Sequence, residues 1–357
     1  MKMATFNLTV LCFSMVVAAQ EAAPPVAAKP FPPPGFTLHD ASRKEEKPRT
    51  VLGPMTTDKQ GRATGSFAAY GGSSLIQVSS LSFSADGKRL AVGSTPSIID
   101  IWDVETRQKV RSFDYGATVA LSLDGTRFAT VGREVRVWDV MSGKLLESMN
   151  WSGGTVWRLT FDNTGTRLLV RANRKEDTVY DVTSGQILST LTNTQEAQFS
   201  RDGSLVIGGN AKHLIVWSTK DWSQVRDLPN GPDYVTRFAV SPEKDMVVIG
   251  GPKSARLVRL SSGEDIAKVG EGYTNFAAFD QSGSFVLTYT ASGFAIWDTS
   301  GKRLCGTPDI GNGTVALSAN DRWLASAPVG KMTDVTIWDA QALLRTCGAP
   351  TSANKQE

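Results

Sequence analysis

The sequence predicts an all-β protein whose main domain is a seven-bladed β-propeller. A pattern of short alternating segments recurs seven times between residues 81 and 340, and five of the seven copies end in Trp-Asp or Trp. From Trp102 to Trp338 the pattern repeats about every 39 residues. A fixed period of that length, built from short strands, is typical of a propeller, whereas a two-layer sandwich gives no reason for it.

Each copy predicts four short strands joined by tight turns. In the first copy the strand patterns cover residues 81–83, 89–92, 98–103 and 109–113. Asp86-Gly87, between the first two strands, suits a two-residue hairpin in which both central residues take positive φ. A Ser-Gly corner, such as Ser142-Gly143, follows the third strand in four copies. The seven copies end near Trp102, Trp138, Tyr180, Trp217, Val258, Trp297 and Trp338.

These small sheets are expected to stack on one another, because one such sheet cannot bury both of its faces alone. Residues 214–217 and 294–297 are apolar at successive positions, which is typical of strands that are covered on both sides. Closing seven sheets into a ring leaves only short, protected edges. The repeat region should therefore fold as one domain.

Taken together, the Asp-Gly turns, the Trp-Asp ends and the Ser-Gly-Lys corners resemble the WD-repeat family of seven-bladed β-propellers. The resemblance covers about residues 77–347. The chain departs from the family in lacking the Gly-His pair that many members carry early in each repeat, since its two histidines, His39 and His213, follow other residues. The pattern is more similar to bacterial, extracytoplasmic relatives than to eukaryotic signalling proteins.

The N-terminus has the layout of a secretory signal. Lys2 precedes an apolar stretch at residues 8–19 that ends in small residues and is too short to span a bilayer. We expect a signal peptide at 1–19, a Pro-rich flexible tether at 20–60, the propeller at 61–350 and a C-terminal tail at 351–357. The protein should therefore be exported, periplasmic or secreted, without a transmembrane anchor.

Two segments compete for the outer strand of the last blade. Residues 61–71 echo the outer strand and exit loop of the first repeat, and residues 343–347 also have an outer-strand pattern. Cys305 and Cys347 are candidates for a disulfide, since an even pair of cysteines in an exported protein is often bridged. Their predicted positions on neighbouring outer strands argue the other way, because blades splay apart there and a bridge needs Cα atoms within about 7 Å.

The sequence contains no motif for catalysis, metal binding or a cofactor. His213 precedes an apolar strand and is interpreted as a packed structural residue, while recurring carboxylates such as Asp86, Asp124 and Asp202 belong to turns. The net charge is +3, with both signs scattered along the chain. Nucleic-acid binding requires a clustered basic surface, so we expect none, and we expect no enzymatic activity and no cofactor.

One aromatic pattern points to a binding face. Tyr115, Tyr234 and Tyr273 each lie nine residues before the first residue of the next hairpin corner, in loops that lead from one blade to the next, and Trp151 occupies a neighbouring loop. Rigid aromatic side chains are common anchors of protein interfaces. In the alternative interpretation, each ring is a buried wedge between adjacent blades.

The resemblance implies a non-catalytic scaffold that mediates protein–protein interaction, and the signal places this outside the cytoplasm. Two other classes stay open. One is a small-ligand or glycan-binding propeller that uses the aromatic side chains as platforms. The other is a propeller hydrolase or oxidoreductase that uses carboxylates in the central channel. A monomer is the simplest expectation for the oligomeric state.

Overall fold

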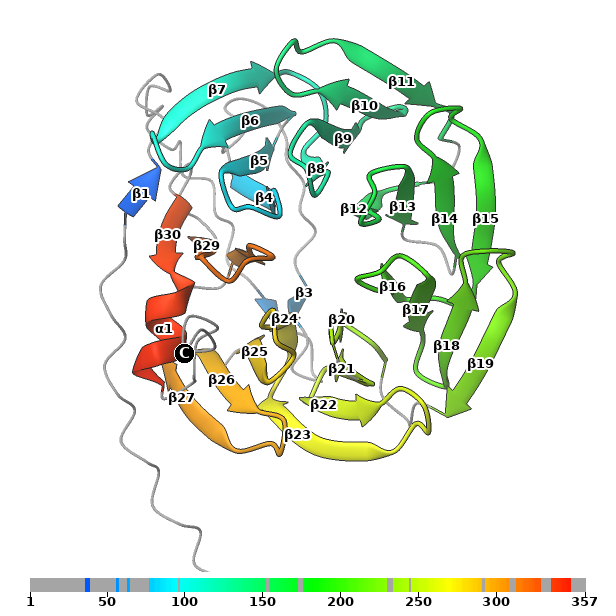
Figure 1. Ribbon diagram of the computed structural model, residues 1–357, viewed down its shortest axis with the longest axis vertical. Helices are drawn as coiled ribbons and strands as arrows, with labels where there is room; N and C mark the ends of the chain where they lie inside the picture. Colours follow the sequence, from blue (N-terminus) through cyan, green and yellow to red (C-terminus); the bar gives the residue numbers. More distant parts are fainter. Residues whose placement is uncertain are drawn as a thin grey trace, which may run out of the picture.

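Seven four-stranded antiparallel sheets, or blades, are arranged in a ring around a central axis (Figure 1). The structure is a computed structural model of the protein. The structure describes residues 36–38, 56–57, 63–64, 77–95, 97–151, 154–172, 176–229, 234–243, 245–290, 293–307, 313–328 and 335–347. The predicted fold class is therefore confirmed. The predicted signal peptide at 1–19 and the tail at 351–357 lie outside the described residues.

The blades follow one another along the chain. Blade 1 contains β4 (Gln77–Phe83), β5 (Arg89–Thr95), β6 (Ile98–Asp103) and β7 (Gln108–Phe113). Blade 2 contains β8 (Thr118–Leu121), β9 (Arg127–Val131), β10 (Val135–Asp139) and β11 (Leu145–Met149). Blade 3 contains β12 (Val156–Phe161), β13 (Arg167–Ala172), β14 (Glu176–Asp181) and β15 (Ile187–Thr192). Blade 4 contains β16 (Glu196–Phe199), β17 (Leu205–Gly209), β18 (His213–Ser218) and β19 (Gln224–Pro229).

The remaining elements complete the ring. Blade 5 contains β20 (Arg237–Val240), β21 (Met246–Gly250), β22 (Ser254–Arg259) and β23 (Asp265–Glu271). Blade 6 contains β24 (Thr274–Phe279), β25 (Phe285–Thr290), β26 (Gly293–Asp298) and β27 (Arg303–Thr307). Blade 7 contains β28 (Gly313–Leu317), β29 (Trp323–Pro328), β30 (Val335–Asp339) and β1 (Phe36–Leu38). A short hairpin of β2 (Thr56–Thr57) and β3 (Ala63–Thr64) and the helix α1 (Ala340–Thr346) lie outside the blades.

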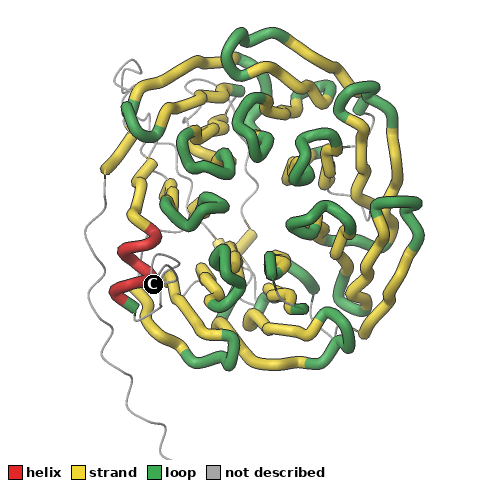
Figure 2. The backbone as a smooth tube through the Cα atoms, in the orientation of Figure 1, coloured by secondary structure: helices red, strands yellow, loops and turns green. Residues whose placement is uncertain are grey.

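Within blades 1 to 6 the strands run in chain order from the axis to the rim (Figure 1), and Figure 2 shows the turns and loops that connect them. The first strands of neighbouring blades contact one another in an unbroken cycle, and β28 meets β4 where the cycle closes. Because the strands alternate in direction, the two faces of the ring carry different connections. The connecting-loop face carries the connections from the fourth strand of one blade to the first strand of the next. The turn face carries the turns between first and second strands.

The turns between the first two strands differ from the predicted two-residue hairpin. Gly87 has a φ of +68°, and its N–H donates to Ser84 O over 3.0 Å. Asp86 is not among the described residues with positive φ, so the turn is type I, followed by a left-handed glycine. The same geometry recurs at Gly125, and Asp321 takes the glycine position in blade 7 with a φ of +56°.

The core is divided into seven apolar clusters, each between two neighbouring blades. Between blades 1 and 2, for example, Ile99 and Ile101 pack with Leu121 and Phe128, and all four are almost completely buried. Burial of this kind stabilises a fold by roughly 25 cal/mol per Å² of apolar surface. Stacking between blades is thus the main source of stability, as the apolar strand patterns predict.

The ring is closed by neither of the two predicted segments. Phe36–Leu38 forms β1, which pairs antiparallel with β30 and supplies the fourth strand of blade 7. Leu38 is 2% exposed and packs in the cluster between blades 7 and 1. This strand lies within the range predicted as a tether. Within the other predicted segment, 61–71, Ala63–Thr64 pairs with Thr56–Thr57, and the other residues lie outside the described part of the chain.

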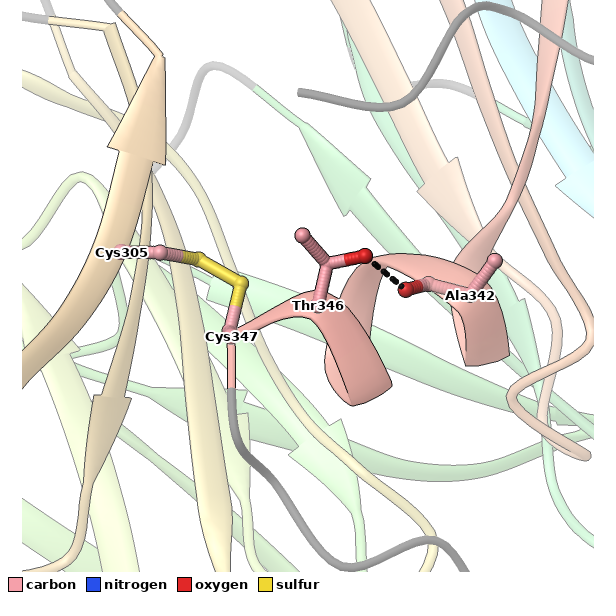
Figure 3. Close-up of a disulfide and its surroundings, with 4 residues drawn as sticks. All are labelled: Cys305, Ala342, Thr346 and Cys347. Carbon is pink, nitrogen blue, oxygen red and sulfur yellow. Dashed lines mark hydrogen bonds between the residues drawn. A yellow bond between two sulfur atoms is a disulfide. The ribbon is translucent and has the colours of Figure 1, made fainter. Parts of the chain in front are cut away.

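The segment predicted as a second outer strand, 343–347, is helical. Asp339 caps α1 by accepting a hydrogen bond from the Ala342 N–H over 2.7 Å, which favours a helix directly after β30. The helix buries Leu343 and Leu344 against blade 6. It also brings Cys347 to Cys305 of β27, and the two form a disulfide with Cα atoms 5.3 Å apart (Figure 3). The helix thereby removes the geometric objection to the bridge.

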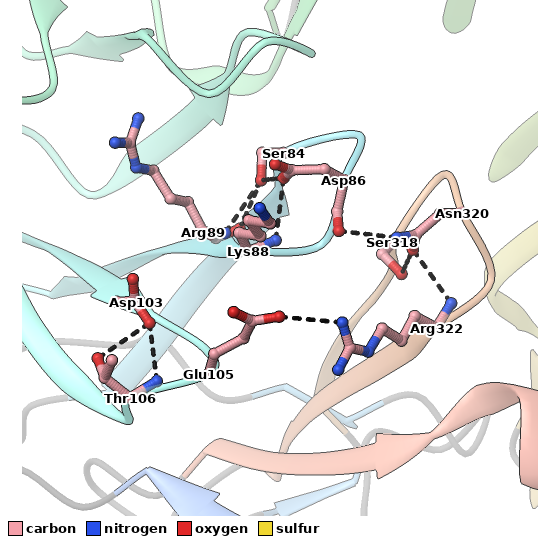
Figure 4. A network of polar contacts seen from close by, with 10 residues as sticks. All are labelled: Ser84, Asp86, Lys88, Arg89, Asp103, Glu105, Thr106, Ser318, Asn320 and Arg322. Carbon is pink, nitrogen blue, oxygen red and sulfur yellow. Dashed lines mark hydrogen bonds and ion pairs between the residues drawn. The ribbon is translucent and has the colours of Figure 1, made fainter.

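Polar contacts join blades 7 and 1 on the turn face (Figure 4). Asn320 donates from Nδ2 to Asp86 O over 2.7 Å, and Arg322 Nη1 lies 3.1 Å from Glu105 Oε1. Exposed ion pairs contribute about 0–1 kcal/mol, so these contacts align the joint while the apolar cluster beneath it supplies most of the stability.

Candidate functional site

On the turn face, the recurring carboxylates are committed to the backbone and to hydroxyl groups. Ser200 donates from Oγ to Asp202 Oδ1 over 2.6 Å, and the Ser204 N–H donates to the same oxygen over 3.0 Å. Hydrogen bonds from these two residues lower the pKa of Asp202. At a corner of the third strand, hydrogen bonds from Ser142 likewise lower the pKa of Asp139. The predicted turn role of these carboxylates is therefore what the structure shows.

The predicted aromatic anchors on the connecting-loop face fall into two groups. Tyr115 is packed: its hydroxyl donates to Glu134 O over 3.1 Å, and the Arg136 guanidinium lies 4.1 Å from the centroid of its ring. Trp151 is half-buried against the cluster between blades 2 and 3, and its Nε1 donates to Gly154 O over 3.0 Å. Both side chains contribute to packing between blades, as the alternative interpretation of a wedge between adjacent blades predicts.

Tyr234 and Tyr273 form the second group. They are 46% and 45% exposed, although they occupy the same loop register as Tyr115. Tyr234 lies just before β20 and Tyr273 just before β24, so both stand at the inner ends of neighbouring blades on the connecting-loop face. These two rings are available to a binding partner.

The most exposed large hydrophobic side chain of the described residues, Trp157, was not predicted. It is 60% exposed although it lies in the first strand of blade 3. The pairing of β12 with β13 shifts between Val156 and Arg158, so Trp157 is the extra residue of a β-bulge. In a regular strand Trp157 would lie on the same side as the buried Leu159 and would be predicted to be buried. The bulge cannot be recognised in the sequence, so the sequence does not predict that Trp157 is exposed.

Beside Trp157 lies a group of charged side chains, which we call the arginine cluster: Arg158, Arg171, Glu196 and Arg237. Arg158 and Arg171 of blade 3 both form ion pairs with Glu196, the first residue of β16 in blade 4. The Glu196 side chain is 1% exposed, whereas that of Arg158 is 41% exposed. The Arg171 guanidinium also lies 5.5 Å from the centroid of the Trp157 ring, a cation–π arrangement.

Arg237 of blade 5 completes the cluster. Its Nε donates to Asn275 O and its Nη1 to Thr236 O, each over 2.8 Å, and none of the described carboxylates forms an ion pair with it. Burial and the charge of Arg158 lower the pKa of Arg237 to about 10, and the nearby Tyr273 phenol opposes this shift. The pKa of Arg171 is also lowered to about 10, by burial and by the charges of Arg158 and Arg237, which outweigh the opposing effect of Asp177.

The arrangement offers binding chemistry rather than acid–base chemistry. It combines guanidinium groups with exposed aromatic rings on the connecting-loop face. Among the described residues there is no group of three or more His, Cys, Asp or Glu side chains placed to hold a metal ion. His213 is half-exposed on the outer part of blade 4, with Nδ1 2.8 Å from Asp227 Oδ1, so its interpretation as a packed residue is wrong.

The predicted repeat ends occupy equivalent positions in the ring. All seven residues predicted to end the repeats, from Trp102 to Trp338, lie near the end of the third strand of a blade. In six blades the pairing with the fourth strand shifts at this position. It is a seven-bladed β-propeller whose repeats resemble those of WD-repeat proteins. The described part of this propeller contains no helix that is both long and apolar enough to cross a membrane.

Comparisons with known proteins point the same way. The propeller is 25% identical over 181 residues to the U3 small nucleolar RNA-associated protein 15 homolog of Gallus gallus, covering 47% of this chain and 35% of that protein. With the homolog of Bos taurus it shares 26% identity over 179 residues, 46% of this chain and 34% of that protein. No family model matches the chain.

The chain is also 24% identical over 197 residues to Apoptotic protease-activating factor 1 of Rattus norvegicus, an alignment that covers 48% of this chain and 15% of that protein. The aligned regions thus span about a third or less of the length of the curated relatives.

Proposed function

We propose that this WD-repeat propeller is a non-catalytic scaffold that binds a protein partner outside the cytoplasm. The observation that carries the proposal is the exposure of Tyr234, Tyr273 and Trp157 near the inner ends of blades on a single face. Aromatic side chains provide a large contact area at a small entropic cost and are enriched at binding hot spots. The backbone ladders and interblade clusters hold them rigidly, so little ordering is needed when a partner binds.

Two observations support a location outside the cytoplasm. The first residues of the chain have the pattern of a cleavable secretory signal. The disulfide between Cys305 and Cys347 suits an oxidising compartment, because thiols are kept reduced in most cytosols. Intact-mass measurement of the protein from its native source is expected to give a chain that begins after Ala19 and carries one disulfide. A full-length chain with both thiols free would contradict the exported location.

Affinity capture with exposed-residue variants tests the scaffold function. Tyr234→Ser and Tyr273→Ser should each lose a protein that co-purifies with the wild type, while their melting temperatures stay close to that of the wild type. Met141→Ser is the matched control, because Met141 is 58% exposed but lies at a corner on the turn face. Equal loss of the partner in the control, or retention in both tyrosine variants, would count against this face.

A further inference from the structure

The arginine cluster carries more positive charge than its own carboxylates neutralise. The charges of Arg158 and Arg237 lower the pKa of Arg171, and the charge of Arg158 lowers the pKa of Arg237. Glu196 forms ion pairs with Arg158 and Arg171. The other nearby carboxyl group, Asp177, is buried, and burial raises its pKa to about 6, so near neutral pH it is ionised. Asp177 and Glu196 together then leave one of the three guanidinium charges without a matching carboxylate. The third guanidinium, on Arg237, donates to backbone carbonyls. An incoming anion would relieve the mutual repulsion of these like charges.

The excess charge lies next to the exposed aromatic rings. Arg158 directly follows Trp157 in β12, Arg171 lies over the Trp157 ring, and Tyr273 is close enough to Arg171 and Arg237 to influence their pKa values. Arg158 keeps 41% of its side-chain surface accessible. A ligand that reaches these arginines therefore also meets Trp157 and Tyr273.

We propose that the partner contributes an acidic segment, whose carboxylate binds Arg158 and Arg237 while a neighbouring apolar side chain packs on Trp157. This inference rests on the proposed scaffold function and adds the chemistry of the partner to it. Guanidinium groups pair with carboxylates through charge-assisted hydrogen bonds. The aromatic side chains beside them favour a chain that alternates carboxylate and apolar groups over a small inorganic anion, which would leave Trp157 uncovered.

Binding of the fluorescently labelled full chain to three sets of short peptides tests the proposal. The sets share apolar residues and differ in carrying Asp and Glu, the corresponding Asn and Gln, or Lys. The acidic set should bind, and its binding should weaken when the salt concentration rises from about 0.05 M to about 0.5 M. Arg158→Gln, Arg237→Gln and Trp157→Ala should each weaken binding about tenfold or more.

Two further variants separate binding from folding. Arg201→Gln removes an arginine on the turn face that pairs with Glu243 and donates to Gln281 O, and this variant should bind as the wild type does. Arg237→Lys keeps the charge if Arg237→Gln proves unstable, and it should bind better than the glutamine variant at equal melting temperature. Trp157→Ala changes an exposed side chain and should fold normally.

Equal binding of the acidic and amide sets would overturn the proposal, and so would wild-type affinity in the Arg158 and Arg237 variants. Binding of only the amide or Lys set, with loss in Tyr234→Ser, would overturn the acidic partner yet leave the scaffold function intact. A site that takes inorganic phosphate, glucuronate or a short RNA but no peptide would contradict both.

Discussion

Thr164 donates a hydrogen bond from Oγ1 to Asp162 Oδ2 over 2.8 Å. In this turn of blade 3 the carboxylate precedes the hydroxyl residue in the chain, which is the reverse of the order in blade 2. In blade 2 the hydroxyl comes first, and Ser122 donates from Oγ to Asp124 Oδ1 over 2.6 Å. In both orders the first side chain also accepts the N–H of the residue five positions later, over 3.1 Å in blade 3 and 3.0 Å in blade 2. The turn therefore requires the pair and not a particular order.

This relationship predicts that the pair can be reversed by mutation. Ser122→Ala should destabilise the protein by about 1 kcal/mol, because the N–H of Arg127 loses its side-chain acceptor. The double change Ser122→Asp with Asp124→Ser copies the order of blade 6, in which Asp280 precedes Ser282. It should be more stable than Ser122→Asp alone, which places two carboxylates side by side. Urea unfolding of the wild type, Ser122→Asp, Asp124→Ser and the double variant measures this. Simple additivity of the stability changes in the two single variants would contradict it.

Tyr115 and Tyr234 should respond differently to the same substitution. Tyr115→Ser is expected to cost about 1–3 kcal/mol of stability, because it removes a packed ring, two hydrogen bonds to Glu134 and the contact with Arg136. Tyr234→Ser should change stability by less than about 0.5 kcal/mol, since its side chain is largely in solvent. The melting temperatures of both variants, measured by thermal unfolding, distinguish a ring packed between blades from a ring exposed to solvent. A similar loss in both would mean that Tyr234 is also packed.

The ring was predictable because its signals repeat. Each Trp-Asp position or its substitute marks the end of a third strand, so even the weak copies at Tyr180 and Val258 could be placed by period. The closing strand could not be placed in this way. Phe36–Leu38 is three residues long, carries no repeat motif and follows a Pro-rich stretch. Its partner β30 lies almost 300 residues further along the chain, and only the completed ring brings them together.

The candidate site was predictable in part for a related reason. The tyrosine register placed Tyr115, Tyr234 and Tyr273 at equivalent positions, but it did not separate the two exposed rings from the packed one. The packing of Tyr115 depends on Glu134 and Arg136 of the following blade. The exposure of Trp157 depends on a bulge. The arginine cluster depends on residues of three blades, with Glu196 of blade 4 paired to Arg158 and Arg171 of blade 3 and with Arg237 supplied by blade 5. Neither a bulge nor a meeting of distant strands leaves a mark in a linear pattern.

Leu38 should prove essential to ring closure. Leu38→Ala is expected to destabilise the protein by about 2–4 kcal/mol, because the side chain is buried in the cluster between blades 7 and 1. Met141→Ala is the control: it removes a similar apolar volume from an exposed site and should change stability by less than about 0.5 kcal/mol. Urea unfolding of the two variants measures the difference. Equal stability of the two would show that β1 does not hold the ring together.

The disulfide should stabilise the last two blades. Cys305 and Cys347 are separated by 42 residues, and a loop of that size corresponds to about 4 kcal/mol in the chain-entropy account, with smaller values common in practice. Reduction should therefore lower the urea midpoint of the wild type. The double change Cys305→Ser with Cys347→Ser should match the reduced wild type and be insensitive to reductant. An unchanged midpoint in reduced wild type would contradict this stabilising role.

Asp177 should make stability fall as the pH rises toward neutrality. Burial raises its pKa from 3.8 to about 6, while the charge of Arg171 and a hydrogen bond from Thr194 oppose the shift. The folded protein therefore holds a proton that the unfolded chain releases near pH 3.8, so this stabilising contribution is complete at low pH and is lost between about pH 4 and pH 6. A pKa difference of this size between the folded and unfolded states corresponds to on the order of 3 kcal/mol in the free energy of unfolding.

Asp177→Asn tests this sign, because the amide cannot titrate. Between about pH 4 and about pH 8 the stability of the variant should rise relative to that of the wild type, whatever its absolute stability. The reason is that only the folded wild type loses a proton from residue 177 in that interval. Asp181→Asn is a control of opposite sign: hydrogen bonds from Ser184 lower the pKa of Asp181, so removing that carboxylate should cost more stability above about pH 4 than below it. Urea unfolding of both variants and the wild type at about pH 2, pH 4 and pH 8 measures the two differences. A stability difference between Asp177→Asn and the wild type that stays constant from about pH 4 to about pH 8 would show that the Asp177 carboxyl group ionises in the folded protein as readily as it does in the unfolded chain.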